Sequence, residues 1–343
     1  MKDALVFDVG GTNLRAARYS FESKKLIAVK KSLTPNNWNS FADEDAPFDL
    51  LINEMKVLSA YLFIDDKPEV VTIGFPGPIT PDGKVLSTPT IWGSTFKGST
   101  ELIPQLKRCW AEATVNVIND VTAAGYFLKT IFPGDFCVIT VSSGIGSKLF
   151  IDGRPYTGKL GRGGEIGHWV TDLSTDALLC ECGGKGHLGG IASGRGTLEF
   201  AKKYSQIFLS DFISSLPGEM TKGNSDLLCN EILVKAFRAH DRWTEEVIAK
   251  PGQQLAKAIA MIHTTTGIES FIIIGGFAIA LGERYRVSLV ESAEKFCWKL
   301  GQNWDDMIHL GPDETEMGLI GSGIYSNMTR PIPHKLISKR IEL

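Results

Sequence analysis

Ala4-Leu5-Val6-Phe7-Asp8-Val9-Gly10-Gly11-Thr12-Asn13-Leu14-Arg15 stands near the start of the chain. The apolar run from Ala4 to Val9 predicts a buried strand, and the glycine pair predicts a turn into a second strand. Glycine allows the backbone amides of such a turn to approach a phosphate group closely, and Thr12 and Asn13 add short hydrogen-bonding groups. Asp8 would repel phosphate, so we expect a magnesium ion or its water shell between them. An ordinary glycine hairpin with a solvated Asp8 remains the alternative at this point.

The same pattern returns in the middle of the chain. Residues 137–141 predict a strand, Ser142-Ser143-Gly144-Ile145-Gly146 a glycine turn, and residues 147–151 the returning strand. This duplication of strand, glycine hairpin and strand is an internal repeat. It has no lysine of the P-loop type, so it favours two hairpins that clasp one nucleotide.

Helical and strand-like segments alternate around these hairpins, which predicts an α/β protein with mixed sheets. Helices are expected at 48–62, 101–113, 196–214, 224–239 and 244–265, and further strands at 14–19, 26–31, 70–74, 115–118 and 271–274. An alanine-rich helix is expected after Asn119-Asp120. We expect an N-terminal α/β domain at 1–120 plus about 313–330, a larger C-terminal α/β domain at 121–312, and a surface arm at 331–343.

Bulk composition excludes several classes of protein. The 343 residues are 43% hydrophobic and 22% charged, with a net charge of -3, which is typical of a globular protein and gives no sign of a nucleic-acid or membrane partner. The apolar stretch after Lys2 meets Asp8 too soon for a signal peptide. The longest apolar run, Phe271 to Leu281, is too short to span a bilayer. We therefore expect a cytoplasmic protein without a disulfide framework.

Four metal-binding side chains cluster between residues 165 and 189. His168, Cys180, Cys182 and His187 form a set that suits tetrahedral Zn²⁺, and a closed set of four ligands is normally structural. Glycines between Cys182 and His187 allow the backbone to fold His187 back toward the cysteines. The alternative is a pair of unrelated histidines and two buried thiols.

Seven motifs occur in an order that closely resembles the ROK family (repressor, open reading frame, kinase) of sugar kinases. They are Asp8-x-Gly-Gly-Thr-x-x-Arg15, Gly74-Phe-Pro-Gly-Pro78, Asn119-Asp120, Ser143-Gly-Ile-Gly146, Glu165-x-Gly-His168, Cys180-x-Cys-Gly-x-x-Gly-His187 and Ile274-Gly-Gly276. The resemblance extends to about Tyr325. It implies an actin-like ATPase (ribonuclease H-like) fold of two related domains with a cleft between them. It also implies ATP, Mg²⁺ and transfer of the γ-phosphoryl group to a sugar hydroxyl.

The resemblance assigns roles to particular residues. Asp120 would be the catalytic base, Asn119 and Glu165 would contact sugar hydroxyls, and His168 would bind both zinc and sugar. Asp120 follows a strand and opens a helix, where a carboxylate can accept a proton from the attacking hydroxyl. A plain helix N-cap is the alternative for Asn119-Asp120. The family also implies substrate contacts by Gly77 and Thr90, and nucleotide or phosphate contacts by Asp8, Gly10, Gly11, Thr12, Asn13, Arg15, Ser143, Gly144, Gly275 and Gly276.

Four positions depart from the family pattern. His187 replaces a cysteine but still suits zinc. Phe277 replaces a glycine; its ring either narrows the nucleotide pocket or points into the core, and we favour the core. Thr90 lies near the position of a usual asparagine. Gly189 stands where most of the family kinases carry a second sugar-binding glutamate. A site built for the hydroxyls near the anomeric end would lose about 1 kcal/mol or more for each missing hydrogen bond.

Because the second sugar-binding glutamate is missing at Gly189, the sequence does not decide which acceptor is phosphorylated. We expect phosphorylation of a C6-type hydroxymethyl group on a hexose or hexose-like ring. A C7-cyclitol kinase of secondary metabolism is one alternative, because a carbocyclic ring with an exocyclic hydroxymethyl group fits a pocket altered at the anomeric end. A glucokinase or N-acylhexosamine kinase with a substitute side chain is the other.

Functions from other classes fit the sequence less well. A repressor of this family would need a helix-turn-helix, and the phosphate motif begins too early to leave room for one. A non-catalytic sugar-binding protein does not explain why Asp8, Asp120 and the glycine hairpins occur together. A zinc hydrolase would need an open coordination position. We expect a homodimer, as is common among soluble enzymes and in this family.

Overall fold

The computed structural model describes residues 3–36, 46–93, 100–313 and 315–331. Backbone contacts divide the chain into two compact units. The first holds the described residues of Met1–Ile131, Gly158–Arg162 and Glu314–Leu343, and the second holds Phe132–Thr157 and Gly163–Asp313. The arm expected at 331–343 lies almost wholly outside the described residues.

The sheet of the first unit has the order β3-β2-β1-β4-β7. Its strands are β1 (Ala4–Val9), β2 (Asn13–Tyr19), β3 (Leu26–Leu33), β4 (Val70–Phe75) and β7 (Thr114–Asn119). The pairs β1–β2 and β2–β3 are antiparallel, whereas β1–β4 and β4–β7 are parallel. Every residue of β1 and β4 is buried, which explains their continuous apolar runs.

The sheet of the second unit has the order β10-β9-β8-β11-β12. Its strands are β8 (Phe136–Val141), β9 (Ile145–Ile151), β10 (Arg154–Tyr156), β11 (Phe271–Ile274) and β12 (Ile308–Leu310). The pairs β8–β9 and β9–β10 are antiparallel, and β8–β11 and β11–β12 are parallel. Strand order and direction therefore repeat those of the first unit, which confirms the duplication predicted from the two glycine hairpins.

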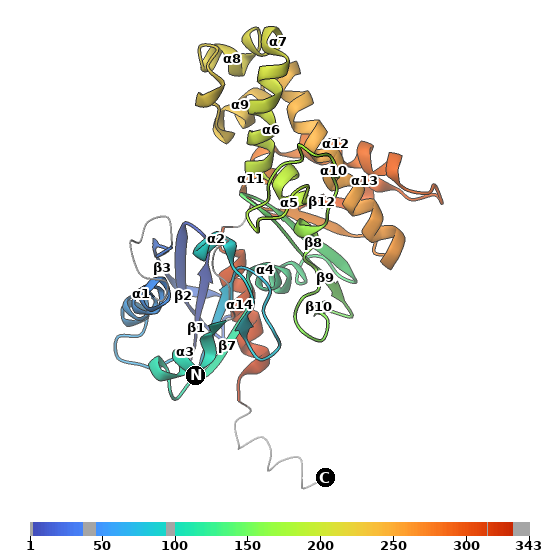
Figure 1. Cartoon of the computed structure of the whole chain (residues 1–343). Helices are drawn as coiled ribbons and strands as arrows, with labels where there is room; N and C mark the ends of the chain where they lie inside the picture. Colours follow the sequence, from blue (N-terminus) through green and yellow to red (C-terminus); the bar gives the residue numbers. More distant parts are fainter. Residues whose placement is uncertain (1–2, 37–45, 94–99, 314, 332–343) are drawn as a thin grey trace. The chain divides into compact units, whose positions relative to one another are not determined.

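Helices pack against each sheet (Figure 1). The first unit has α1 (Ala46–Leu62), α2 (Pro89–Trp92), α3 (Leu102–Cys109), α4 (Asp120–Leu128) and α14 (Met317–Thr329), with a small β5–β6 pair (Lys84–Val85, Thr100–Glu101). The second unit has α5 (Leu188–Ala192), α6 (Gly194–Ile207), α7 (Leu209–Ile213), α8 (Leu216–Met220), α9 (Asn230–Arg238), α10 (Arg242–Thr266), α11 (Gly276–Leu281), α12 (Glu283–Phe296), α13 (Trp304–Met307) and the short 3-10 helices η1 (Ile166–His168) and η2 (Ser225–Leu227). No described helix is long and apolar enough to cross a membrane.

Helix α4 belongs to the first unit, although the expected domain ranges began the second domain at 121. The reason is its packing against α14, which lies beside it in Figure 1. A Cβ added at Gly321 of α14 would lie only 1.7 Å from the carbonyl oxygen of Ala123 in α4. This close approach of two helix backbones, about 200 positions apart, is invisible in local sequence patterns.

Several predicted helices differ in their ends. The segment expected as one helix at 196–214 forms α6 and α7, and the helix expected at 224–239 begins only at Asn230 after a 3-10 turn. Helix α3 ends at Cys109 rather than near 113. Each unit has its own apolar core, one packed around β1 and β4 and the other around β8, α10 and β11.

Candidate active site

The first glycine turn is held by its carbonyl groups. Thr34 donates from its backbone nitrogen to the carbonyl of Thr12 at 3.0 Å and from its hydroxyl to that of Gly10 at 2.7 Å. Asn36 Nδ2 donates to the carbonyl of Gly11 at 2.6 Å. Neighbouring donors occupy these three carbonyls, and the Gly10 amide closes the turn by donating to the Asn13 carbonyl at 2.9 Å. The side chain of Thr12 is exposed. The other amides of a glycine turn held in this way can bind an anion.

Asp8 lies at the end of β1 and pairs with Arg15 across the β1–β2 ladder. Their Oδ2 and Nη2 atoms are 2.6 Å apart, and Arg15 also donates to the carbonyl of Thr315. Burial raises the pKa of Asp8, and the Arg15 guanidinium opposes this shift. Gly318 of α14 lies against this carboxylate, since a Cβ there would be 3.0 Å from Asp8 Cγ. The fold therefore buries a carboxylate directly beside the glycine turn.

Asn119 and Asp120 lie where β7 ends and α4 begins. Asn119 is the N-cap, because its Oδ1 accepts from the Thr122 amide at 3.0 Å. Its Nδ2 donates to the Gly77 carbonyl at 3.0 Å and to Asp120 Oδ1 at 2.9 Å, and the Val121 amide donates to the same oxygen at 2.8 Å. Asn119 is thus the residue that caps the helix. The half-buried Asp120 carboxylate is not needed as the cap, and two donors orient it for another role.

Gly77 needs to be glycine, because its φ is +101° and a Cβ would meet the carbonyl oxygen of Ser87 at 2.0 Å. The structure therefore brings Gly77, Asn119 and Asp120 together. Thr90 lies in α2, and its side chain is outside what the structure describes.

The second glycine turn is also held by its carbonyl groups. The Ser142 amide donates to the Gly144 carbonyl at 3.0 Å, and the Gly194 amide donates to the Ser142 carbonyl at 2.8 Å. Arg195 Nε donates to the Ser143 carbonyl at 2.8 Å, and the same guanidinium pairs with Glu181. Sequence reasoning missed Arg195, which opens α6 and has no motif of its own. It connects the turn to the Cys-x-Cys segment.

Gly275 and Gly276 separate β11 from α11. Gly275 has a φ of +99°, and a Cβ there would lie 2.7 Å from both Thr140 Oγ1 and the Val141 carbonyl oxygen at the end of β8. A Cβ at Gly276 would meet no atom of the described residues within 4 Å, so this position is open. Phe277 is buried in the core of the second unit, which confirms that its ring points into the core.

The four candidate metal ligands come together in the second unit. Their donor atoms all lie within 4.8 Å of one another. His168 Nδ1 is 3.9 Å from Cys180 Sγ, and His187 Nδ1 is 3.1 Å from Cys182 Sγ. Tetrahedral zinc with bonds of about 2.0–2.3 Å needs ligand atoms separated by about 3.3–3.8 Å, so the set fits zinc with small adjustments.

Two features of the loop suit a metal ligand set. Desolvation lowers the pKa of His168, while Glu165 opposes this shift and His187 adds to it; a lowered pKa favours the neutral imidazole that binds metal. The glycine spacer is also required sterically, since a Cβ at Gly184 would lie 2.2 Å from the His187 ring.

Gly189 lies against the backbone of the segment that carries His168. A Cβ at Gly189 would be 3.0 Å from the Gly167 carbonyl oxygen, tighter than ordinary contacts. Gly167 is itself confined, because a Cβ there would meet the Ile145 carbonyl oxygen at 2.2 Å. The place where the family has its second glutamate is therefore occupied by close backbone packing.

Lys148 of β9 is a buried cation that sequence reasoning did not single out. Its Nζ donates to Glu165 Oε1 at 2.6 Å and to the Gly163 carbonyl at 2.8 Å. Beside it, the Ser147 hydroxyl donates to the Gly164 carbonyl at 2.5 Å. Two consecutive residues of β9 thus hold the three residues 163–165 that lead into the His168 segment.

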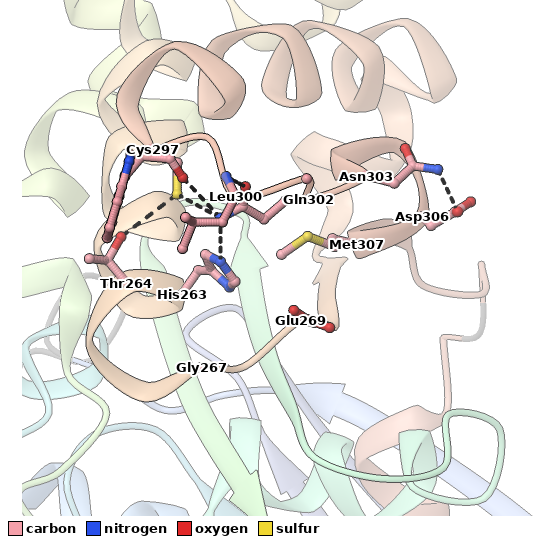
Figure 2. Close-up of a pocket in the computed structure, with 12 residues that line it drawn as sticks. His263, Thr264, Gly267, Glu269, Cys297, Leu300, Gln302, Asn303, Asp306 and Met307 are labelled. Carbon is pink, nitrogen blue, oxygen red and sulfur yellow. Dashed lines mark hydrogen bonds between the residues drawn. The ribbon is translucent and has the colours of Figure 1, made fainter.

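A pocket of about 740 Å³ lies elsewhere in the second unit (Figure 2). It is lined by the end of α10, the segment around Cys297 to Gln302, and α13. Its His263 and Gln302 side chains face one another, with ring and amide nitrogens 3.2 Å apart. None of the site residues predicted from the motifs lines this pocket, and neither of the two glycine turns belongs to its lining.

Two units with the same sheet order, each with a glycine turn between its first two strands, define a protein of the actin-like ATPase class. The chain belongs to the ROK family, whose model matches residues 6–322. The predicted fold and the resemblance to this family are thereby confirmed.

Relatives and solved structures support this assignment. The chain is 34% identical over 334 residues to a C(7)-cyclitol 7-kinase of Streptomyces hygroscopicus subsp. limoneus, covering 94% of this chain and 93% of that protein. It is 29% identical over 293 residues to an N-acetylmannosamine kinase of Escherichia coli (strain SMS-3-5 / SECEC), covering 84% and 87% of the two chains. A ROK family glucokinase from Streptomyces griseus, solved with glucose and AMPPNP, shares the fold with a TM-score of 0.73 at 20% identity, covering 95% and 99% of the two chains.

Proposed function

We propose that this chain is an ATP-dependent kinase that phosphorylates an exocyclic hydroxymethyl group on a hexose-like ring, with a C7-cyclitol as the favoured acceptor. The observation that carries the proposal is the 34% identity to a C(7)-cyclitol 7-kinase over 94% of the chain. Hexoses and N-acylhexosamines are the competing acceptors, because kinases of N-acetylmannosamine are also relatives over most of the length.

The nucleotide side is assigned to the two glycine turns. The first turn, made of Gly10, Gly11, Thr12 and Asn13, and the second turn at Ser143 and Gly144 would face phosphate, with Gly275 and Gly276 beside the adenosine. Support comes from the carbonyl groups of both turns, which are already bonded to neighbouring donors. Magnesium would neutralise the charge that develops on the phosphoryl oxygens. Asp8, fixed by Arg15, would hold the water shell of that ion.

The acceptor side is assigned to Gly77, Thr90, Asn119, Asp120, Glu165 and His168. Asp120 would take the proton of the attacking hydroxyl as its oxygen bonds to the γ-phosphorus and the bond to the leaving ADP breaks. Asn119 orients that carboxylate through the contact of 2.9 Å and would bind a ring hydroxyl beside it. The Asp120 carboxylate is thus positioned before a substrate arrives.

His168, Cys180, Cys182 and His187 would hold a structural zinc ion. The support is the donor set and its convergence within 4.8 Å. The two short contacts use Nδ1 of each histidine, so Nε2 of His168 would be left to bind a substrate hydroxyl. Zinc would then fix the orientation of an acceptor-binding imidazole rather than take part in the chemistry.

The close packing of Gly189 on Gly167 favours the cyclitol over glucose. Gly189 offers no carboxylate, and its close packing leaves little room for one, so a hydroxyl near the anomeric end would lose a charged acceptor. A carbocyclic acceptor with a different pattern of oxygens at that end would not need it.

A coupled assay of ADP release with glucose, mannose, N-acetylmannosamine, fructose and 2-epi-5-epi-valiolone tests the proposal. We expect the highest kcat/KM for the cyclitol. Glucose turnover with a KM in the micromolar to low millimolar range and a higher kcat/KM than the cyclitol would contradict the acceptor assignment. No turnover of any acceptor would contradict the kinase assignment.

Asp120→Asn tests the catalytic base. We expect kcat to fall by about 10²–10⁴-fold because the amide cannot accept the proton. Binding of an ATP analogue, measured by calorimetry, should change little because Asp120 contacts the acceptor side. Full activity of the variant would instead support a role for this residue in helix capping alone.

A further inference from the structure

The buried Lys148 contacts Glu165, a residue assigned to the acceptor side. The inference drawn from this contact rests on the function proposed above. The side chain is 2% exposed, whereas that of its partner Glu165 is 26% exposed. A lysine ammonium has three donors and no acceptor, and its charge is costly to bury unless it is paired. Lys148 meets this need with Glu165 and the Gly163 carbonyl.

The pair is built into the architecture. Lys148 lies opposite Val138 in the β8–β9 ladder, so its backbone is held by the pairing of these two strands. Gly164, with a φ of +82°, is wrapped against the lysine, and a Cβ there would be 3.1 Å from Lys148 Cδ and 3.3 Å from Nζ. The segment 163–165 therefore closes around the lysine, which is the more deeply buried of the two partners.

The pairing determines what Glu165 can offer. Oε1 of Glu165 is bonded to Lys148, so Oε2 is the oxygen that remains for a substrate hydroxyl. The ammonium of Lys148 also offsets the negative charge of this carboxylate. The more exposed end of the pair is the carboxylate, consistent with a group that reaches toward a ligand while its partner stays inside.

We propose that Lys148 is a positioning residue for acceptor specificity. It holds Glu165 through Oε1, so that Glu165 presents Oε2 to an uncharged polyhydroxylated ring while the ammonium offsets the carboxylate charge. It acts through Glu165 and not on the nucleotide. Lys148 and the absence of a carboxylate at position 189 would together reduce the anionic character of this part of the site.

Steady-state kinetics of four variants test the proposal, with the acceptor that the wild-type enzyme uses best. Lys148→Met removes the charge at similar length, Glu165→Gln removes the partner charge, and a double variant combines them. Ser147→Ala is the matched control, since it removes the neighbouring bond of 2.5 Å to the same segment without touching Glu165.

We expect Lys148→Met to raise the acceptor KM at least tenfold and to change the MgATP KM less than twofold. Ser147→Ala should leave both within threefold. The double variant should bind acceptor no worse than Glu165→Gln alone, because Lys148 acts through that carboxylate. Equal effects of Lys148→Met and Ser147→Ala, parallel changes in both KM values, or additive losses in the double variant would each overturn the proposal.

Stability gives a second readout. Glu165→Gln should lower the melting temperature more than Lys148→Met, because it leaves an ammonium buried, whereas Lys148→Met leaves a carboxylate that is partly in water. The reverse order would contradict the pairing.

If Lys148→Met fails to fold, Lys148→Arg carries the kinetic test. A raised acceptor KM with an unchanged MgATP KM supports the proposal, and equal changes oppose it. If the wild-type protein phosphorylates no acceptor, the inference falls with the proposed function. An active wild type without an acceptor-specific defect refutes the inference alone.

Discussion

The absence of a side chain at Gly189 is explained by the residues packed around it. The sequence indicated an absent glutamate and left open what replaces it. The structure places the Gly167 carbonyl 3.0 Å from where a Cβ at 189 would stand, so backbone occupies the space. Gly167 cannot easily retreat, because Ile145 confines it in turn. Gly189 is therefore packed in a chain of close backbone contacts that also includes Gly167 and Ile145.

Restoring the family residue should consequently have two separable effects. Gly189→Ala and Gly189→Glu both add a Cβ, and we expect each to destabilise the fold by about 1–3 kcal/mol through overpacking. Only Gly189→Glu adds a carboxylate, which should raise kcat/KM for glucose relative to a cyclitol by roughly tenfold. Thermal unfolding and the acceptor ratio measure the two effects. An alanine variant as stable as wild type would show that the packing is looser than the structure indicates.

At the scale of elements, the N-terminus of α6 holds the second glycine turn. Ser193 caps the helix by accepting from the Gly196 amide at 3.1 Å, Gly194 donates to the carbonyl of Ser142, and Arg195 to that of Ser143. Local sequence predicted the helix and the turn separately, within a few residues. Their contact depends on an arginine more than 50 positions from the turn, so no local pattern could indicate it.

Arg195→Gln tests this contact. The guanidinium donates to the turn and pairs with Glu181, so its loss should loosen the turn and raise the MgATP KM by about tenfold, with the acceptor KM nearly unchanged. Lys203→Gln, at an exposed position of the same helix, is the matched control. Equal behaviour of the two variants would show that the turn is held without Arg195.

At the scale of the whole molecule, each unit has its own sheet and its own apolar core. The duplication was predictable because apolar strands and glycine turns are local features. Asp8, Asn119, Asp120 and the four candidate metal ligands could be proposed from the sequence, since each stands within a short motif, and the structure brings the four candidate ligands together. Lys148 and Arg195 were not, because their roles depend on contacts across the fold. Helices α12 and α14 were not predicted either, because their sequences lack a comparably strong pattern of apolar residues or motifs.

Separate cores imply separate responses to loss of the proposed zinc. In calorimetry, Cys182→Ser or treatment with a strong chelator should lower the melting temperature of one transition, that of the second unit, and leave the other nearly unchanged. Metal analysis should show one zinc per chain in the wild type and a loss in the variant. Cys229→Ser, a change at a half-buried cysteine outside the cluster, controls for the loss of a thiol. A wild-type protein free of zinc would contradict the assignment.

Helix α14 gives the molecule an unusual order of assembly. It packs on α4, β1 and β4, and its Ser326 hydroxyl donates to that of Thr72 at 2.7 Å. The first unit thus needs residues that are synthesised after the whole of the second unit, whereas most of the second unit is one continuous stretch, 163–313. During synthesis, the later unit should therefore be able to fold first. The nascent N-terminal strands would meanwhile remain exposed until α14 has been synthesised.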